Sequence, residues 1–228
     1  MGQLIDGIWK VDEISPNKVD GTYKRENSVF RDWISEEEGA EFLPESGRYH
    51  LYISHACPWA HRTLIFRVLK NLEDHISVDV VHPEMLENGW AFDTKFSDTT
   101  GDSLYGKEFL SEIYTQANNN ITCRVTVPIL LDKKSKKIVS NESADIIRIF
   151  NSSFDKITGN TEDFWPKNLQ KEIEPINKRI YETLNNGVLD KKFSIDWDKF
   201  KNSIIVTNVE GTKKISTRIF EVIEFNKN

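Results

Sequence analysis

Between residues 49 and 82, two short runs of strand-like residues flank a segment in which apolar residues have the spacing of a helix. The run 49–53 is short and rich in residues that favour strands, and the turn 54–58, Ser-His-Ala-Cys-Pro, follows it. Apolar residues then recur every three or four positions over 59–72, which predicts an amphipathic helix, and 77–82 predicts a second strand. A strand, a helix and a strand in this order indicate parallel strands joined by a right-handed crossover.

A second block follows a stretch at 84–122 that contains several glycines and predicts loops. Residues 124–131 predict a strand, although Pro128 lies within it, and residues 137–140 predict another short strand. Residues 141–151 have the spacing of a helix, for which Asn141 is a suitable N-cap. The two blocks together predict an α/β fold with the order βαβ and then ββα.

The two ends of the chain carry weaker patterns. Residues 1–47 are polar with scattered aromatic residues, and we expect an extended lead that packs onto the body through those side chains. Apolar residues at 169–188 recur at steps of three or four, which predicts an amphipathic helix that ends at Asn186-Gly187. Pro175 within it should either kink the helix or start a new register. Beyond this helix, 204–211 and 218–225 resemble short alternating strands.

Composition and charge indicate a folded protein and give no sign of nucleic-acid or membrane binding. Of 228 residues, 38% are hydrophobic and 29% are charged, which is ordinary for a folded chain, and the net charge of −6 gives no overall attraction to nucleic acid or to anionic membranes. We find no apolar run of about 18 residues and no secretory leader, and two cysteines cannot form a disulfide scaffold. We therefore expect a cytoplasmic protein that binds neither nucleic acid nor a membrane.

Cys57 is the residue most suited to chemistry. It lies between a predicted strand and a predicted helix, directly before Pro58, which fits the first helical position. Free N–H groups at a helix N-terminus favour a thiolate, so the position suits a nucleophile, although most free cysteines are simply small buried hydrophobic residues. Ala60 stands where a two-cysteine redox motif has its second thiol, so the resolving thiol must come from elsewhere, and glutathione is the cytosolic candidate.

Cys123 has two interpretations, a resolving thiol and a hydrophobic residue at a strand edge, and its pattern favours the second. Pro128 within a predicted strand indicates either a cis bond after Val127 or a proline on an edge strand. A cis bond would turn the backbone N–H and C=O of Val127 outward, where they could pair with an extended peptide. Spacing alone does not decide between these two alternatives.

Three further positions have both a binding and a structural interpretation. Glu142 and Ser143 open a helix, so they suit either a carboxylate ligand or ordinary capping, and the residues alone favour capping. Arg124 could bind a carboxylate or be a solvated charge at a strand end. Trp90 could line a ligand site or pack locally within its loop. The histidines match no zinc spacing and no glycine-rich phosphate loop is present, so we expect no metal cofactor.

Several runs together resemble one enzyme family. These runs are 46–63, 87–90, 124–128, 139–143 and 185–188, and they occur in that family's order. The first run, which surrounds Cys57, is the most specific. Over about residues 1–193 the chain resembles the glutathionyl-hydroquinone reductases, which are the xi class of glutathione transferases.

The resemblance implies a fold and a set of roles. It implies a thioredoxin-like domain at 48–152, preceded by the lead at 1–47 and followed by an all-α domain at 165–228. Cys57 would be the nucleophile, and the glutathione-binding residues would be Trp90, Arg124, Val127, Glu142 and Ser143. The implied reaction releases a hydroquinone from a glutathionyl-hydroquinone through a mixed disulfide between Cys57 and glutathione, which acts as co-substrate; family members form homodimers.

Two departures from the family pattern bear on these expectations. Leu189 stands where the family has a tyrosine of the hydroquinone pocket, and a leucine cannot protonate or orient a leaving oxygen. The pattern also stops near Phe193, so we expect an incomplete helical domain with a divergent tail at 194–228 that lacks the family's dimerisation surface. A non-catalytic remnant and an omega-like general thiol transferase are therefore the alternatives to the reductase.

Overall fold

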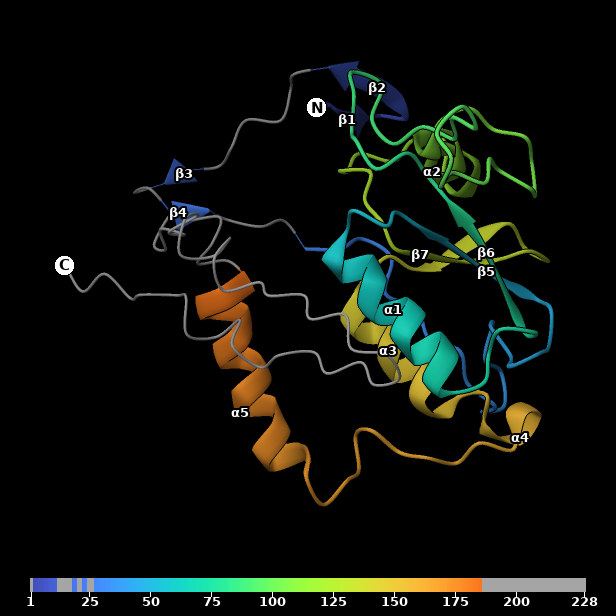
Figure 1. Ribbon diagram of the computed structural model, residues 1–228, viewed down its shortest axis with the longest axis vertical. Helices are drawn as coiled ribbons and strands as arrows, with labels where there is room; N and C mark the ends of the chain where they lie inside the picture. The colour runs from blue at the N-terminus through green and yellow to red at the C-terminus, as the bar shows by residue number, and fades with distance from the viewer. Residues whose placement is uncertain (1, 12–17, 20–21, 24–26, 186–228) are drawn as a thin grey trace, which may run out of the picture. The chain divides into compact units, whose positions relative to one another are not determined.

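The computed structural model describes residues 2–11, 18–19, 22–23 and 27–185 (Figure 1). The chain forms two compact units, Met1–Ser15 with Glu26–Pro166 and Pro16–Arg25 with Lys167–Asn228. The first unit contains a four-stranded sheet and the helices packed on it. None of the helices in the described ranges is both long enough and apolar enough to cross a membrane.

The sheet has the order β6-β5-β7-β8, which places the strand next to Cys57 in its interior. Its strands are β5 (Tyr49–Ile53), β6 (Ile76–Val80), β7 (Ile129–Asp132) and β8 (Lys137–Ser140). β5 and β6 are parallel and are connected through α1 (Pro58–Leu69), whereas β7 pairs antiparallel with both β5 and β8. The predicted βαβ unit and the ββα unit that follows it are confirmed, and together they form a thioredoxin-like mixed sheet.

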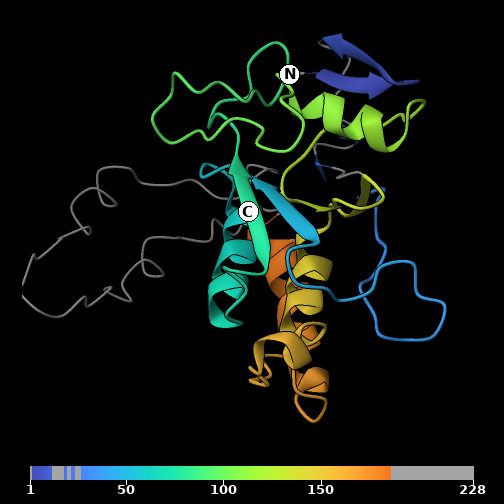
Figure 2. The ribbon, with the colours of Figure 1, turned by 90° about the vertical axis from the view of Figure 1, so that its right-hand side faces the viewer.

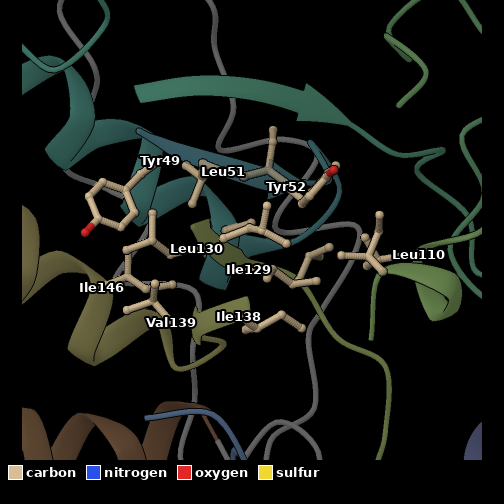
Figure 3. Packing of buried hydrophobic residues seen from close by; sticks show 14 of the residues in the cluster. Tyr49, Leu51, Tyr52, Leu110, Ile129, Leu130, Ile138, Val139 and Ile146 are labelled. Carbon is tan, nitrogen blue, oxygen red and sulfur yellow. The ribbon is translucent and has the colours of Figure 1, made fainter. Parts of the chain in front are cut away.

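Helices cover both faces of this sheet. α1 and α3 (Ser143–Ser152) lie side by side against one face in both views, and α2 (Leu110–Ala117) lies on the opposite side (Figures 1 and 2). Alternate side chains of each strand point to opposite faces. Accordingly, Tyr49 and Leu130 pack toward Ile146 of α3, while Tyr52 and Ile129 lie toward Leu110 of α2 (Figure 3). The short helix α4 (Asp155–Thr158) follows α3.

The loop-rich stretch expected at 84–122 also contains a helix, α2, that its pattern did not predict. This helix buries Leu110, Ile113 and Tyr114, and the carboxylate of Glu112 accepts the N–H groups of Glu108 and Phe109 before its first turn. These apolar positions have helical spacing, but the run is only eight residues long and follows a glycine-containing stretch. The short signal is therefore hidden by its surroundings.

The lead also contains a regular element that its sequence pattern did not predict. β1 (Gly2–Ile5) and β2 (Ile8–Val11) form an antiparallel hairpin whose turn is Asp6-Gly7, with φ angles of 49° and 76°. The hairpin joins the body where Leu4 exchanges backbone hydrogen bonds with Cys123. An Asp-Gly pair between two strands is a strong signal for such a turn, because glycine accepts a positive φ without strain.

The predicted boundaries of two elements are wrong by a few residues. The strand expected at 124–131 begins only at Ile129, because the Val127–Pro128 bond is cis and the preceding residues run irregularly. The helix expected from Asn141 begins at Ser143, with Glu142 as its N-cap. Asn141 does not cap this helix because its side chain accepts the N–H of Phe30 and donates to the hydroxyl of Tyr114.

The second unit contains α5 (Gln170–Ile180) and the π-helical turn Tyr181–Asn185, and also the two-residue strands β3 (Lys18–Val19) and β4 (Thr22–Tyr23). α5 corresponds to the predicted amphipathic helix and contains Pro175. The predicted helix end at Asn186-Gly187, Leu189 and the strands expected beyond Phe193 lie outside the described residues.

Candidate active site

Cys57 lies at the junction of β5 and α1, where the sequence places it. It is the N-cap residue of α1, its backbone is extended, and Pro58 begins the helix. Its N–H donates to the carbonyl of Ser54 at 3.0 Å, which closes the turn after the strand. Cys57 is half-buried, whereas Cys123 is buried.

The thiol of Cys57 contacts the segment before β7. It donates to the carbonyl oxygen of Val127 across 3.6 Å. The bond from Val127 to Pro128 is cis, which confirms the first of the two alternatives for this proline. Within the described residues, the N–H of Val127 has no hydrogen-bond partner. A backbone donor and the thiol therefore lie together at this point, as an extended peptide ligand would require.

A buried tyrosine holds this segment in place. The hydroxyl of Tyr114 in α2 donates to the carbonyl of Thr126 at 2.9 Å and accepts the N–H of the same residue at 3.1 Å. It also accepts the side-chain amide of Asn141, the residue before Glu142. Burial raises the pKa of Tyr114 to about 12 against the effect of these hydrogen bonds, so the phenol keeps its proton at neutral pH.

Glu142 caps α3 with its side chain. One carboxylate oxygen accepts the N–H of Ala144 at 3.1 Å, and the other accepts the hydroxyl of Ser28 at 2.9 Å. The structure thus confirms a capping role for this residue. Part of the carboxylate remains exposed to solvent, with 29% of the side-chain surface accessible, so a cationic group of a ligand can still reach it.

Ser143, the first residue of α3, is bound to the helix that carries Cys57. Its hydroxyl oxygen accepts two hydrogen bonds from Arg62 of α1, from Nε at 3.1 Å and from Nη2 at 2.7 Å. The Arg62 guanidinium also lies 3.7 Å from Glu142 Oε1 and stacks on the ring of Trp59 at 5.2 Å. Arg62 thus connects the N-terminal regions of the two helices that border the site.

Trp90 and Arg124 lie in the irregular segments between β6 and β7. Trp90 is partly buried against the core, and its indole Nε1 is buried without a hydrogen-bond partner among the described residues. Its position depends on the preceding Gly89, which has a φ of 79° and packs against the ring of Trp9. Arg124 is half-buried directly after Cys123 and has electrostatic or hydrogen-bonding contacts of its own.

Cys123 is buried and pairs through its backbone with Leu4 of the hairpin, which agrees with its interpretation as a strand-edge hydrophobic residue. Cys57 and Cys123 form no disulfide with each other. No group of three or more His, Cys, Asp or Glu side chains in the described ranges is arranged to hold a metal ion.

Sequence reasoning missed Arg62, Tyr114 and Ser28 as parts of this site. Arg62 follows Cys57 by five positions on the predicted helix, but its partner Ser143 is 81 residues away in the sequence. Tyr114 lies on the helix that was not predicted, and Ser28 lies in a segment without periodicity. No local signal in the sequence identifies contacts of this range.

Comparisons with known proteins agree with this geometry. The N-terminal domain of glutathione S-transferases matches residues 56–153, which include Cys57, Val127 and Ser143. Among curated proteins, glutathionyl-hydroquinone reductase YqjG of Escherichia coli K12 is 48% identical over 211 residues, which cover 90% of this chain and 64% of that protein. Glutathionyl-hydroquinone reductase PcpF of Sphingobium chlorophenolicum is 44% identical over 89% of this chain and 63% of that protein.

Solved structures of glutathione transferases also resemble this chain. A xi-class glutathione transferase from Natrialba magadii superposes with a TM-score of 0.76 at 45% identity, over 82% of this chain and 57% of that one. The chain is thus similar to xi-class glutathione transferases over most of its own length. The glutathione-bound structure of YqjG from Escherichia coli K12 superposes on this chain with a TM-score of 0.73 at 46% identity, over 88% of this chain and 61% of that one.

The chain spans less than two thirds of the length of these two curated reductases. The family match at residues 56–153 includes α1, α3, the strands β6, β7 and β8, and the site residues Cys57, Val127 and Ser143.

Proposed function

We propose that this chain catalyses the glutathione-dependent release of hydroquinones from glutathionyl-hydroquinones, with Cys57 as its single reactive thiol. The observation that carries the proposal is the position of Cys57 at the N-cap of α1, with its thiol on the carbonyl of Val127. Ala60 lies one turn further along α1, where a resolving cysteine would be needed for an internal disulfide. A free thiol from solution must therefore complete the cycle.

The proposed reaction has two thiol steps. In the first, the Cys57 thiolate attacks the glutathione sulfur of the substrate, the bond from sulfur to the ring carbon breaks, and the ring carbon leaves with the electron pair and takes up a proton. This step forms a disulfide between Cys57 and glutathione and releases the hydroquinone. In the second, a glutathione thiolate attacks that disulfide, which restores the Cys57 thiol and forms oxidised glutathione.

We infer that glutathione lies along the segment from Val127 to the N-terminus of α3. The free N–H of Val127 suits the cysteinyl backbone of the tripeptide, and the exposed part of the Glu142 carboxylate suits its ammonium group. The backbone N–H of Ser143 has no partner among the described residues, and its hydroxyl hydrogen is also available. Both groups can donate to a carboxylate. Trp90 and Arg124 would complete the binding site from the segments between β6 and β7.

An omega-like general thiol transferase is the second candidate, because one relative is named omega-like. Glutathione S-transferase omega-like 2 of Schizosaccharomyces pombe is 46% identical over 82% of this chain and 60% of that protein. Both candidates use the same mixed disulfide at Cys57, and they differ in what the thiol attacks. The homodimer and the cytoplasmic location stay predictions.

Trapping the intermediate tests the proposal. The full chain is mixed with a glutathionyl-hydroquinone in the absence of free glutathione, and its intact mass is measured over time. We expect one added glutathione per chain, located on the peptide that contains Cys57, and one equivalent of released hydroquinone. Addition of glutathione should remove the adduct.

Two matched measurements complete this experiment. Cys123→Ser should form the adduct as the unmodified chain does, and Cys57→Ser should form none. A small mixed disulfide, such as that between cysteine and glutathione, replaces the quinol in a parallel reaction. Adduct formation from the disulfide alone would favour the general thiol transferase, and a folded chain with no adduct from either reactant would contradict both candidates.

A further inference from the structure

The contact between Arg62 and Ser143 determines what the serine can offer to a ligand. A serine hydroxyl has one O–H donor and two acceptor lone pairs. Here the oxygen accepts from both Nε and Nη2 of Arg62, at 3.1 and 2.7 Å, so both lone pairs are occupied. The hydroxyl hydrogen is therefore left to donate, and the serine cannot accept from an additional donor.

The backbone of Ser143 also offers a hydrogen-bond donor. The carboxylate of Glu142 accepts the N–H of Ala144, and the carbonyl of Glu142 accepts the next two N–H groups of the helix. The N–H of Ser143 has no partner in the described part of the chain. Ser143 thus presents two donors at the positive end of α3, an arrangement that selects a group which only accepts, such as a carboxylate.

Arg62 is itself held in a fixed orientation. Its guanidinium lies over the ring of Trp59, one turn earlier on α1, at 5.2 Å from the ring centre, and 3.7 Å from the Glu142 carboxylate. Only 33% of its side-chain surface is exposed. The planar guanidinium holds its Nε–H and Nη2–H groups in a fixed geometry toward one oxygen, which a lysine ammonium cannot reproduce.

We propose that Arg62 is a positioning residue, which fixes Ser143 as a donor toward a carboxylate of glutathione and holds the N-terminus of α3 against the helix of Cys57. Arg62 acts through Ser143 and does not need to touch the ligand. The inference rests on the proposed function, because glutathione is the ligand whose carboxylate Ser143 receives.

A double-mutant cycle tests this inference. Glutathione is titrated by calorimetry into the full chain carrying Cys57→Ser, which prevents disulfide formation, and into the same parent with Arg62→Gln, Ser143→Ala or both. We expect each single substitution to raise the Kd about tenfold, and the double substitution to raise it about tenfold as well, because both remove the same contact. A Kd raised about a hundredfold by the double substitution would show independent effects and overturn the inference.

Arg31→Gln is the matched control. Arg31 also donates two hydrogen bonds to the first turn of α3, to the carboxylate of Asp145, so its loss removes a comparable anchor from the same helix without affecting Ser143. We expect the Kd of this variant to stay within about twofold of the parent, which is below the tenfold effect of one lost charged contact. An equal loss of affinity in Arg31→Gln would mean that any loosening of α3 suffices, and would overturn the specific role of Arg62.

Arg62→Lys separates geometry from charge. It retains the positive charge but loses the pair of parallel donors, and we expect its Kd to stay severalfold above that of the parent. Full affinity in Arg62→Lys would overturn the donor-fixing role. If the Cys57→Ser parent itself fails to bind glutathione, the proposed function fails together with this inference; if the parent binds and Arg62→Gln binds equally well, only the role of Arg62 fails.

Discussion

The thiol of Cys57 donates a hydrogen bond to the carbonyl oxygen of Val127 across 3.6 Å, although the two residues are 70 positions apart in the sequence. This contact joins the turn after β5 to the segment before β7, two neighbouring strands of the sheet. It places the only chemically reactive group of the site next to a backbone N–H that has no partner among the described residues.

The two roles of Glu142 can be separated by a pair of substitutions. Glu142→Gln keeps an oxygen for the N–H of Ala144 but removes the negative charge, so we expect near-native stability with weaker glutathione binding. Glu142→Ala removes the cap as well and should lower the free energy of unfolding by about 1 kcal/mol. Urea denaturation and calorimetry measure the two quantities separately, and equal affinity in Glu142→Gln and the unmodified chain would contradict a ligand role.

Tyr114→Phe should loosen the segment that presents Val127. The substitution keeps the ring but leaves the backbone of Thr126 and the amide of Asn141 without their buried partner. We expect a loss of about 1–3 kcal/mol in the free energy of unfolding, because buried polar groups that lose a partner retain their desolvation cost. Urea denaturation followed by tryptophan fluorescence provides the measurement, and an unchanged midpoint would mean that water replaces the hydroxyl.

Gly89→Ala and Gly106→Ala form a matched pair at positive φ. Both positions have left-handed backbones, with φ of 79° and 65°, so both variants are strained. A Cβ at Gly89 would lie 2.8 Å from the ring of Trp9, whereas a Cβ at Gly106 would meet nothing within 4 Å. We expect Gly89→Ala to be the less stable variant and to bind glutathione more weakly, since Trp90 follows directly. Equal effects in the two variants would show that the contact with Trp9 is unimportant.

The ion pair between Arg48 and Asp132 predicts a specific dependence of stability on pH. Arg48 donates two hydrogen bonds of 2.7 Å to the Asp132 carboxylate, whose side chain is fully buried. Burial alone would raise the pKa of Asp132, but the hydrogen bonds from Arg48 and Ser135 outweigh it and lower the pKa to about 2. The pair stabilises the fold above the unfolded pKa of about 4, and its contribution is lost as the pH falls from about 4 to 2.

Asp132→Asn should therefore lower the free energy of unfolding at pH 7 by about 2 kcal/mol or more, since each unit of pKa shift corresponds to about 1.4 kcal/mol. The difference between variant and unmodified chain should shrink as the pH falls through that window. Glu45→Gln, which breaks the exposed pair with Lys134, is the control and should have little effect at any pH. A difference at pH 7 that does not shrink in acid would point to a packing defect.

Much of the fold could be predicted because its signals are local. The strand-like residues at 49–53 and 137–140 and the helical spacing after Pro58 identify β5, β8 and α1 without reference to the rest of the chain. α2 was missed because its eight residues follow a glycine-containing segment, and the β1–β2 hairpin because its strands have four residues each. In both cases the decisive signals, the spacing of Leu110, Ile113 and Tyr114 and the Asp6-Gly7 turn, were present but short.

The site also contains residues that local sequence identifies and contacts that it does not. A cysteine between a strand and a proline-initiated helix identifies Cys57 from neighbouring residues alone, and the Pro128 anomaly draws attention to Val127. The contacts that connect them to the rest of the site join residues far apart in the sequence, such as Arg62 with Ser143. Such pairs depend on how α1 and α3 pack on one face of the sheet, which periodicity does not specify.

The most direct test of the central claim is turnover of a glutathionyl-hydroquinone by the full chain in the presence of glutathione, with free hydroquinone followed by chromatography. Cys57→Ser and Cys123→Ser are measured beside the unmodified chain, and circular dichroism verifies that all three are folded. We predict that hydroquinone and oxidised glutathione are released in equal amounts, that Cys57→Ser abolishes their release, and that Cys123→Ser leaves the rate within about twofold, because the proposed cycle uses one enzyme thiol and an external one. Absence of release by the folded, unmodified chain, or release that persists in Cys57→Ser, would contradict the account.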